Sequence, residues 1–224
     1  SPRIFNPENW SPSWSYINQI AENKTVICKV APGIDDQFIS NWDTIWISDN
    51  GDLVEAMTVS GGTGLRSAVL IQDEEILMFR PQLDAPIKAD GEYLIVPNSA
   101  ITRAGAIDSI CTASGGGLVN EHIGWITSDE TTLITELLNT MPIPADIYQV
   151  LARTKAEPKT IAQRIREIPA SAITITTRGI QVDVERMRKQ ISPKLQRSAP
   201  ELVVALYRDN TGNKALICRR LPHR

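Results

Sequence analysis

The sequence predicts an α+β protein: an all-β sandwich or barrel-like domain, then a smaller helical α+β domain ending in a β-hairpin. Three observations lead to this prediction. Short apolar runs separated by turn signals fill the first part of the chain, helical spacing of apolar residues begins after Thr127, and the charge changes sign there. The predicted organisation is an extended arm over 1–22, an acidic β-rich domain over 23–127 and a basic α+β domain over 128–224.

The change of charge is large. Residues 1–127 hold seven Lys/Arg and sixteen Asp/Glu, whereas residues 128–224 hold sixteen Lys/Arg and ten Asp/Glu. Opposed charges of this size favour either a polyanionic partner for the basic half or association between unlike halves. The 42% hydrophobic and 22% charged residues are typical of a globular protein.

The first 22 residues alternate proline with aromatic residues. Proline fixes φ and discourages regular structure, so this segment is expected to be an extended arm whose aromatic side chains pack on another surface. That surface is either the arm's own domain or a neighbouring subunit. Trp10 and Trp14 are therefore the candidate assembly residues.

Residues 23–127 are expected to form strands. Asn50-Gly51 lies between two apolar runs and predicts a hairpin, because both residues tolerate the positive φ of a tight turn. A polar bend at 72–74 predicts a second hairpin. The expected strands are 25–30, 44–48, 53–59, 65–71, 75–79, 93–96 and 122–127.

Helical signals follow Thr127, where a hydroxyl side chain precedes a carboxylate by three residues, as in a helix cap. Proline residues then mark where helices start and stop. The expected helices are one after Thr127 that ends before Pro142, one over 146–153, one from Pro158 to 168, and one over 184–191. The expected strands are 172–176, 180–182, 202–207 and 214–219, the last two forming a hairpin.

Exposed cations of the basic half are the candidate nucleic-acid-binding residues, because they neutralise phosphates and release counterions. On the helix 184–191, Arg186 and Lys189 are expected to face away from Met187 and Ile191. Since only Tyr148 and Tyr207 could stack on bases, backbone contacts with little sequence preference are expected. A solvated surface that balances the acidic half is the alternative. The candidates are Arg164, Arg166, Arg178, Arg186, Arg188, Lys189, Lys194, Arg197, Arg219 and Arg220.

Catalytic signals are weak. Asp183 and Glu185, with Lys189 nearby, could hold a divalent cation if they point to one face of a strand, as a metal-dependent nuclease would require. Alternatively, Asp183 caps the helix that follows. A Cys111/His122 nucleophile pair is conceivable.

Two glycine-rich loops, 60–64 and 114–117, could cradle an anion, but both are interpreted as turns because neither has a phosphate-loop pattern. No cofactor and no metal is expected.

The leading hypothesis is a non-enzymatic, self-assembling protein that contacts nucleic acid, such as RNA, through its basic half. A coat, matrix, nucleoprotein-like or adapter role fits this hypothesis, with a homo-oligomer or larger complex expected. A nuclease using Asp183 and Glu185 and a protein–protein interaction module without a nucleic-acid partner are the alternatives. No apolar run approaches the ~20 residues of a membrane span, and three dispersed cysteines suit a reducing compartment. A cytoplasmic protein is expected, with a nuclear or virion-associated location left open.

Overall fold

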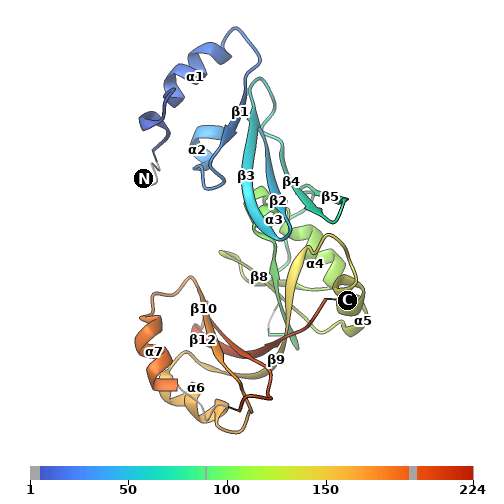
Figure 1. The fold of residues 1–224 in the computed structure, drawn as a ribbon, viewed down its shortest axis with the longest axis vertical. Helices are drawn as coiled ribbons and strands as arrows, with labels where there is room; N and C mark the ends of the chain where they lie inside the picture. The colour runs from blue at the N-terminus through green and yellow to red at the C-terminus, as the bar shows by residue number, and fades with distance from the viewer. Residues whose placement is uncertain (1–5, 89, 192–195, 224) are drawn as a thin grey trace. The chain divides into compact units, whose positions relative to one another are not determined.

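The computed structural model describes residues 6–88, 90–191 and 196–223 (Figure 1). These residues form a mixed α+β fold with seven α-helices, one short 3-10 helix and twelve strands in two sheets. No helix in this part of the chain is long and apolar enough to cross a membrane. The α+β class is confirmed, but the predicted arrangement within it is not.

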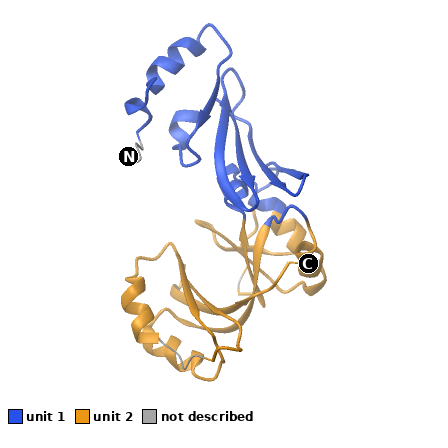
Figure 2. Cartoon of the chain, in the orientation of Figure 1, with its two compact units in different colours: residues 1–84, 98–109, 141–144 blue, residues 85–97, 110–140, 145–224 orange. Residues whose placement is uncertain are grey.

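The chain forms two compact units that do not coincide with the predicted division after residue 127 (Figure 2). Unit 1 comprises residues 1–84, 98–109 and 141–144, and unit 2 comprises residues 85–97, 110–140 and 145–224. The two-domain description is therefore not confirmed, because the chain passes between the units several times. Local sequence patterns do not indicate where the chain re-enters a unit that it has left.

Unit 1 is built on a five-stranded sheet with the order β1-β3-β2-β4-β5. Its strands are β1 (Ile27–Val30), β2 (Asp43–Asp49), β3 (Asp52–Val59), β4 (Arg66–Gln72) and β5 (Glu75–Phe79). The β2–β3 hairpin is confirmed, with positive φ at Asn50 (49°) and Gly51 (87°). β2 and β4 are parallel, so the sheet is mixed and is not the predicted sandwich or barrel.

Helices also occur in unit 1, both in the segment predicted to be an extended arm and in the domain predicted to be all β. They are η1 (Pro7–Asn9), α1 (Trp14–Ala21), α2 (Asp36–Ile39) and α3 (Ser99–Ala104). The predicted extended arm is wrong: the Ser13 hydroxyl accepts a hydrogen bond from Tyr16 N and starts α1. Trp14 is 2% exposed and its ring lies 5.2 Å from that of Trp42. Trp14 therefore packs within its own chain, and Trp10 meets it edge-on.

Unit 2 is built on a seven-stranded sheet with the order β10-β11-β12-β9-β6-β8-β7. Strands from both sides of residue 127 therefore share one sheet. The strands are β6 (Tyr93–Pro97), β7 (Gly117–Asn120), β8 (Ile123–Ser128), β9 (Ala145–Lys155), β10 (Ile173–Arg178), β11 (Leu202–Asp209) and β12 (Gly212–Arg220). The helices are α5 (Thr131–Leu138), α6 (Pro158–Ile165) and α7 (Val184–Ile191), and α4 (Ile107–Ser114) runs from unit 1 into unit 2.

Strand β11 is buried on both faces, which explains its uninterrupted apolar sequence. Leu202, Val204 and Leu206 pack in one core with residues of α6 and α7. Val203, Ala205 and Tyr207 pack in a second core that includes Trp125 of β8. The predicted helix 184–191 and the hairpin of β11 and β12 are confirmed.

Several predicted elements are wrong. The expected helix over 146–153 is strand β9, because Ile147 occupies a fully buried position in the middle of the sheet between β6 and β12. Residues 180–182 are not a strand but a loop before α7. Helices α3 and α4 and strand β7 were not predicted at all.

Candidate functional site

A polar pocket of unit 2 lies at the end of a strand–helix–strand unit. Strands β10 and β11 are adjacent and parallel, and α7 connects them. Because parallel strands run the same way, their carboxyl ends meet at one edge, where open α/β sheets commonly bind ligands. A pocket of about 660 Å³ lies there, lined by Gly179, Ile180, Gln181, Arg208 and Asn213. We call it the strand-end pocket.

Local contacts fix the frame of the strand-end pocket. Gly179 has φ of 63°, a conformation that favours glycine, and a Cβ there would lie 3.3 Å from Cδ1 of Ile123. The turn between β11 and β12 is bound to the turn between β7 and β8, because Asn120 Nδ2 donates to Asn210 Oδ1 (3.2 Å). Three loops that are distant in sequence therefore meet around this pocket.

The one charged residue among the five that line the strand-end pocket is a cation, Arg208. Arg208 is exposed and has no ion-pair partner among the residues that the structure describes, and the exposed Arg178 precedes Gly179. Asp209 is the nearest acid in the sequence, but Thr211 donates two hydrogen bonds to it (2.7 Å each) and Lys214 lies 3.9 Å away. Although burial acts to raise it, these contacts hold the pKa of Asp209 below its usual value.

The proposed nuclease carboxylates have structural partners instead. The Asp183 carboxylate accepts a hydrogen bond from Arg186 N (3.0 Å) and caps the first turn of α7. Glu185 lies in that turn and pairs with Arg188 (3.5 Å). Within the described ranges, no group of three or more His, Cys, Asp or Glu residues is placed to hold a metal ion. The capping interpretation of Asp183 accounts for both carboxylates.

The candidate basic residues on the helices are at the surface. Arg164 lies on α6 and Arg166 follows it, while Arg186, Arg188 and Lys189 lie on α7, and all five are exposed. Met187 and Ile191 are buried against the sheet, so the predicted division of α7 into an apolar and a basic face is confirmed. Arg197 is exposed in the segment before β11, and Lys194 lies outside the described residues.

The remaining candidates lie at the other end of the sheet. Arg219 and Arg220 end β12, six and seven residues after Asn213, which places them roughly 20–23 Å along the strand from the strand-end pocket. Arg220 forms an ion pair with Asp146, and Arg219 is partly buried. The nine candidates within the described residues therefore do not form one continuous patch. We use the name helical basic surface for the exposed cations of α6 and α7, namely Arg164, Arg166, Arg186, Arg188 and Lys189.

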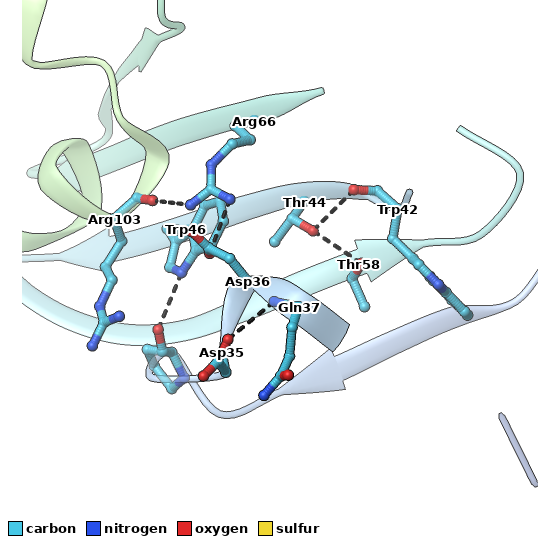
Figure 3. A network of polar contacts seen from close by, with 10 residues as sticks. Asp35, Asp36, Gln37, Trp42, Thr44, Trp46, Thr58, Arg66 and Arg103 are labelled. Carbon is cyan, nitrogen blue, oxygen red and sulfur yellow. Dashed lines mark hydrogen bonds and ion pairs between the residues drawn. The ribbon is translucent and has the colours of Figure 1, made fainter. Parts of the chain in front are cut away.

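Unit 1 contains a separate network around Arg66, at the loop that follows β1 (Figure 3). Arg66 donates to Asp36 Oδ1 (3.0 Å) and to the backbone oxygen of Arg103 (2.6 Å). Its guanidinium carbon lies 4.5 Å from the centre of the Trp46 ring. Trp46 in turn donates from Nε1 to the backbone oxygen of Pro32 (3.1 Å). The network joins α2, β2, β4 and α3, and it was not predicted.

The glycine-rich loops are occupied by the chain's own groups. Thr63 N and Leu65 N donate to Asp43 Oδ1 (2.9 and 2.8 Å), and a Cβ at Gly62 would collide with that carboxylate. In the second loop, a Cβ at Gly116 would lie 2.6 Å from the Thr127 backbone oxygen. In both loops the backbone packs closely against other groups of the chain. This agrees with their interpretation as turns.

The Cys111/His122 pair is not formed. Cys111 is buried in α4, whereas the His122 side chain is 83% exposed and lies 3.4 Å from Glu121. The sequence suggested this pair only through the short separation of the two residues along the chain. The fold gives them different environments.

Comparison with known proteins finds similarity to a THUMP-like family and to methyltransferases. Residues 145–220 match a family described as THUMP domain-like. The chain is 23% identical over 230 residues to uncharacterized S-adenosylmethionine-dependent methyltransferases of Mycobacterium tuberculosis strains CDC 1551 / Oshkosh and H37Rv. These matches cover 97% of this chain and 60% of each relative, so the chain spans under two thirds of their length.

The fold also resembles a methyltransferase structure. A crystal structure of a proposed methyltransferase from Porphyromonas gingivalis W83 matches with a TM-score of 0.64 and 14% sequence identity, over 95% of this chain and 55% of that one. The prediction of a non-enzymatic, self-assembling structural protein is therefore wrong, because the relatives it resembles are methyltransferases. The two alternatives, a nuclease and a protein–protein interaction module, are set aside together with this prediction.

Sequence reasoning missed most of the strand-end pocket. Gln181 and Asn213 are 32 positions apart and neither belongs to a recognisable motif. The signal that could have found them is the strand–helix–strand order over 173–209, since a parallel pair brings its carboxyl ends together. Treating 180–182 as a strand concealed the loop that lines the pocket.

Proposed function

We propose that this chain is part of an S-adenosylmethionine-dependent methyltransferase that acts on RNA, and that its THUMP-like segment contacts the RNA. The observation that carries the proposal is the charge of that segment. Residues 145–220 contain fifteen Lys/Arg and seven Asp/Glu, although the whole chain has a net charge of −3. A surplus of this size attracts a phosphate backbone, and the relatives along almost the whole chain are methyltransferases.

RNA is the nucleic acid that the comparison favours, because the THUMP-like match suggests RNA binding. The helical basic surface supports the same proposal. Its side chains are exposed on two helices that pack together over the sheet, so they can reach phosphates without unfolding any core. Contacts of this kind position the RNA, and they do not read its sequence.

S-adenosylmethionine, when bound, supplies the methyl group that is transferred. Neither glycine-rich loop of this chain fits such a ligand. The amides of Thr63 and Leu65 already donate to Asp43, and the loop at Gly116 is closed against Thr127. We therefore assign no residue of this chain to the cofactor. We propose that the part of the relatives that this chain does not span holds it.

Analysis of cellular RNA tests the enzymatic proposal. Nucleosides from total RNA of cells with and without the gene are compared by mass spectrometry. Loss of one methylated nucleoside, restored when the gene is returned, is the expected result. An unchanged set of methylated nucleosides, with a methyl group lost from a protein instead, would contradict RNA as the substrate.

A binding measurement tests the role of the helical basic surface. Fluorescence anisotropy with a labelled RNA hairpin is expected to give an affinity that falls steeply with salt. The double variant Arg186→Glu, Lys189→Glu should weaken binding by about tenfold or more, because it replaces two phosphate contacts with repulsion. The control variant Lys24→Glu, Lys29→Glu makes the same charge change in unit 1 and should bind normally. Equal losses in the two variants would show that only net charge matters.

A further inference from the structure

We infer that the strand-end pocket binds a single unstacked nucleotide of the RNA, with Arg208 on its phosphate and Gln181 and Asn213 on its base. This inference rests on the proposed function, which it makes more specific. The helical basic surface can only hold the backbone, whereas this pocket offers groups that can recognise a base. The residues come from the loop after β10 and from the hairpin of β11 and β12.

The chemistry of the lining matches the parts of a nucleotide. The Arg208 guanidinium presents a fork of donors that suits phosphate oxygens. Gln181 and Asn213 each carry an amide that both donates and accepts, as the edges of RNA bases require. Ile180 provides an apolar surface for the face of a base, and Gly179 leaves space because it has no side chain.

The size of the strand-end pocket suits the same ligand. Its volume of about 660 Å³ lies within the ~300–1,000 Å³ that small-molecule sites occupy. A duplex could not place a base there, because its bases are stacked and paired. Sequence-specific RNA recognition mostly uses unpaired nucleotides whose bases are free to turn outward.

Neighbouring acids do not oppose a phosphate at Arg208. Asp209 is engaged by Thr211 and Lys214, and Asp183 accepts a hydrogen bond from the first turn of α7. The cap also means that the amino end of α7 is not the anion site. Arg208 is then the cation that a phosphate in the pocket meets.

No aromatic residue is among the five described residues that line the pocket. A base here cannot stack on an aromatic ring, so affinity for an isolated base should be low. Discrimination between bases should instead depend on hydrogen bonds from the two amides. This feature distinguishes the strand-end pocket from the stacking platforms of many single-stranded RNA-binding proteins.

Calorimetric titration of the full chain tests the inference. The probes are the four nucleoside 5′-monophosphates and, separately, inorganic phosphate. At least one nucleotide should bind saturably and about tenfold or more tightly than phosphate, and an RNA hairpin with an unpaired loop should displace it. Arg208→Gln should weaken nucleotide and phosphate alike. Gln181→Leu should weaken the nucleotide about tenfold and leave phosphate unchanged, because it removes base contacts only.

Lys24→Gln in unit 1 is the matched control, since it removes one exposed cation outside both the strand-end pocket and the helical basic surface. It should leave nucleotide binding unchanged, and circular dichroism should show that all three variants fold. Nucleotides that bind no tighter than phosphate, an Arg208→Gln variant that binds normally, or nucleotide binding that RNA does not displace would each overturn the inference. Salt-dependent RNA binding that persists in these cases would leave the proposed function standing, so the two failures can be told apart.

Discussion

At the scale of single residues, two side chains that join distant elements, Arg66 and Asn98, are ones that no local pattern singles out. Arg66 begins a strand in the sequence, yet it bonds to α2 and α3 and covers the Trp46 ring. Asn98 caps α3 by accepting from Ala100 N (2.8 Å), and it also donates to Ser48 on β2 (3.0 Å). Each forms hydrogen bonds to residues 30 or more positions away, which explains why sequence reasoning did not identify them.

The Arg66 network predicts that lysine cannot replace this arginine. Arg66→Met should lower the free energy of unfolding by about 1–2 kcal/mol, because it removes two hydrogen bonds. One of them belongs to the ion pair with Asp36, which is partly exposed to solvent. Arg66→Lys should cost nearly as much, since an ammonium group cannot bond to Asp36 and to the Arg103 oxygen while it stacks on Trp46. Urea unfolding measures both. Full stability in Arg66→Lys would show that charge alone matters there.

Cys218 predicts a dependence of stability on pH. It is fully buried, and burial raises the pKa of its thiol from 9.0 to about 12. An unfolded chain then loses the thiol proton above about pH 9 while the folded chain keeps it, so the free energy of unfolding falls as pH rises from 9 towards 12. For one such proton, the free energy of unfolding falls by about 1.4 kcal/mol per pH unit within this range.

Urea unfolding at pH 7, 9 and 10.5 checks this dependence, with Cys218→Ala as the comparison. The variant should be less stable at pH 7 because of the cavity, but its stability should fall less steeply with pH. Tyr207 adds a similar contribution, because burial and the neighbouring Asp90 also raise its pKa. Identical slopes in the two proteins would show that Cys218 does not cause the effect, and would assign it to other groups with a raised pKa, such as Tyr207 and Tyr148.

At the scale of elements, turns and caps could be predicted and pairing could not. The hairpin at Asn50-Gly51 and the helix 184–191 were found because their signals lie within a few residues. Strand β9 was taken for a helix, because Ile147, Val150 and Leu151 also have helical spacing and only the neighbouring strands decide between the two. The pocket residues Gln181 and Asn213 were missed for the same reason, since the parallel pairing of β10 and β11 brings them together.

The cap of α7 predicts a difference between two substitutions at Asp183. Asp183→Ala should lower the free energy of unfolding by about 1 kcal/mol, because Arg186 N loses its partner. Asp183→Asn should be nearly as stable as the original, since asparagine caps helices as well as aspartate does. Thermal unfolding of the two variants measures the difference. Two equally destabilised proteins would indicate that the charge of Asp183, not its capping oxygen, is required.

At the scale of the whole molecule, the charge asymmetry was the most useful feature of the sequence, although its first interpretation was wrong. It indicated a polyanion partner for the basic half, and the THUMP-like match falls within that half. It also suggested a self-assembling structural protein, and the similarity to methyltransferases contradicts that prediction. Composition identifies a charged segment, but it carries no information about catalysis performed by other residues.

Lysine footprinting distinguishes a localised interface from attraction by the whole molecule. The chain is acetylated with and without an RNA hairpin, and the rate at each lysine is measured by mass spectrometry. Lys155, Lys159 and Lys189 are exposed within the THUMP-like segment, so RNA should slow their acetylation roughly threefold or more. Lys24 and Lys29 are exposed in unit 1, which is rich in acids, and their rates should not change. Equal protection of all five lysines would place RNA over both units and remove the THUMP-like segment as the particular site of contact.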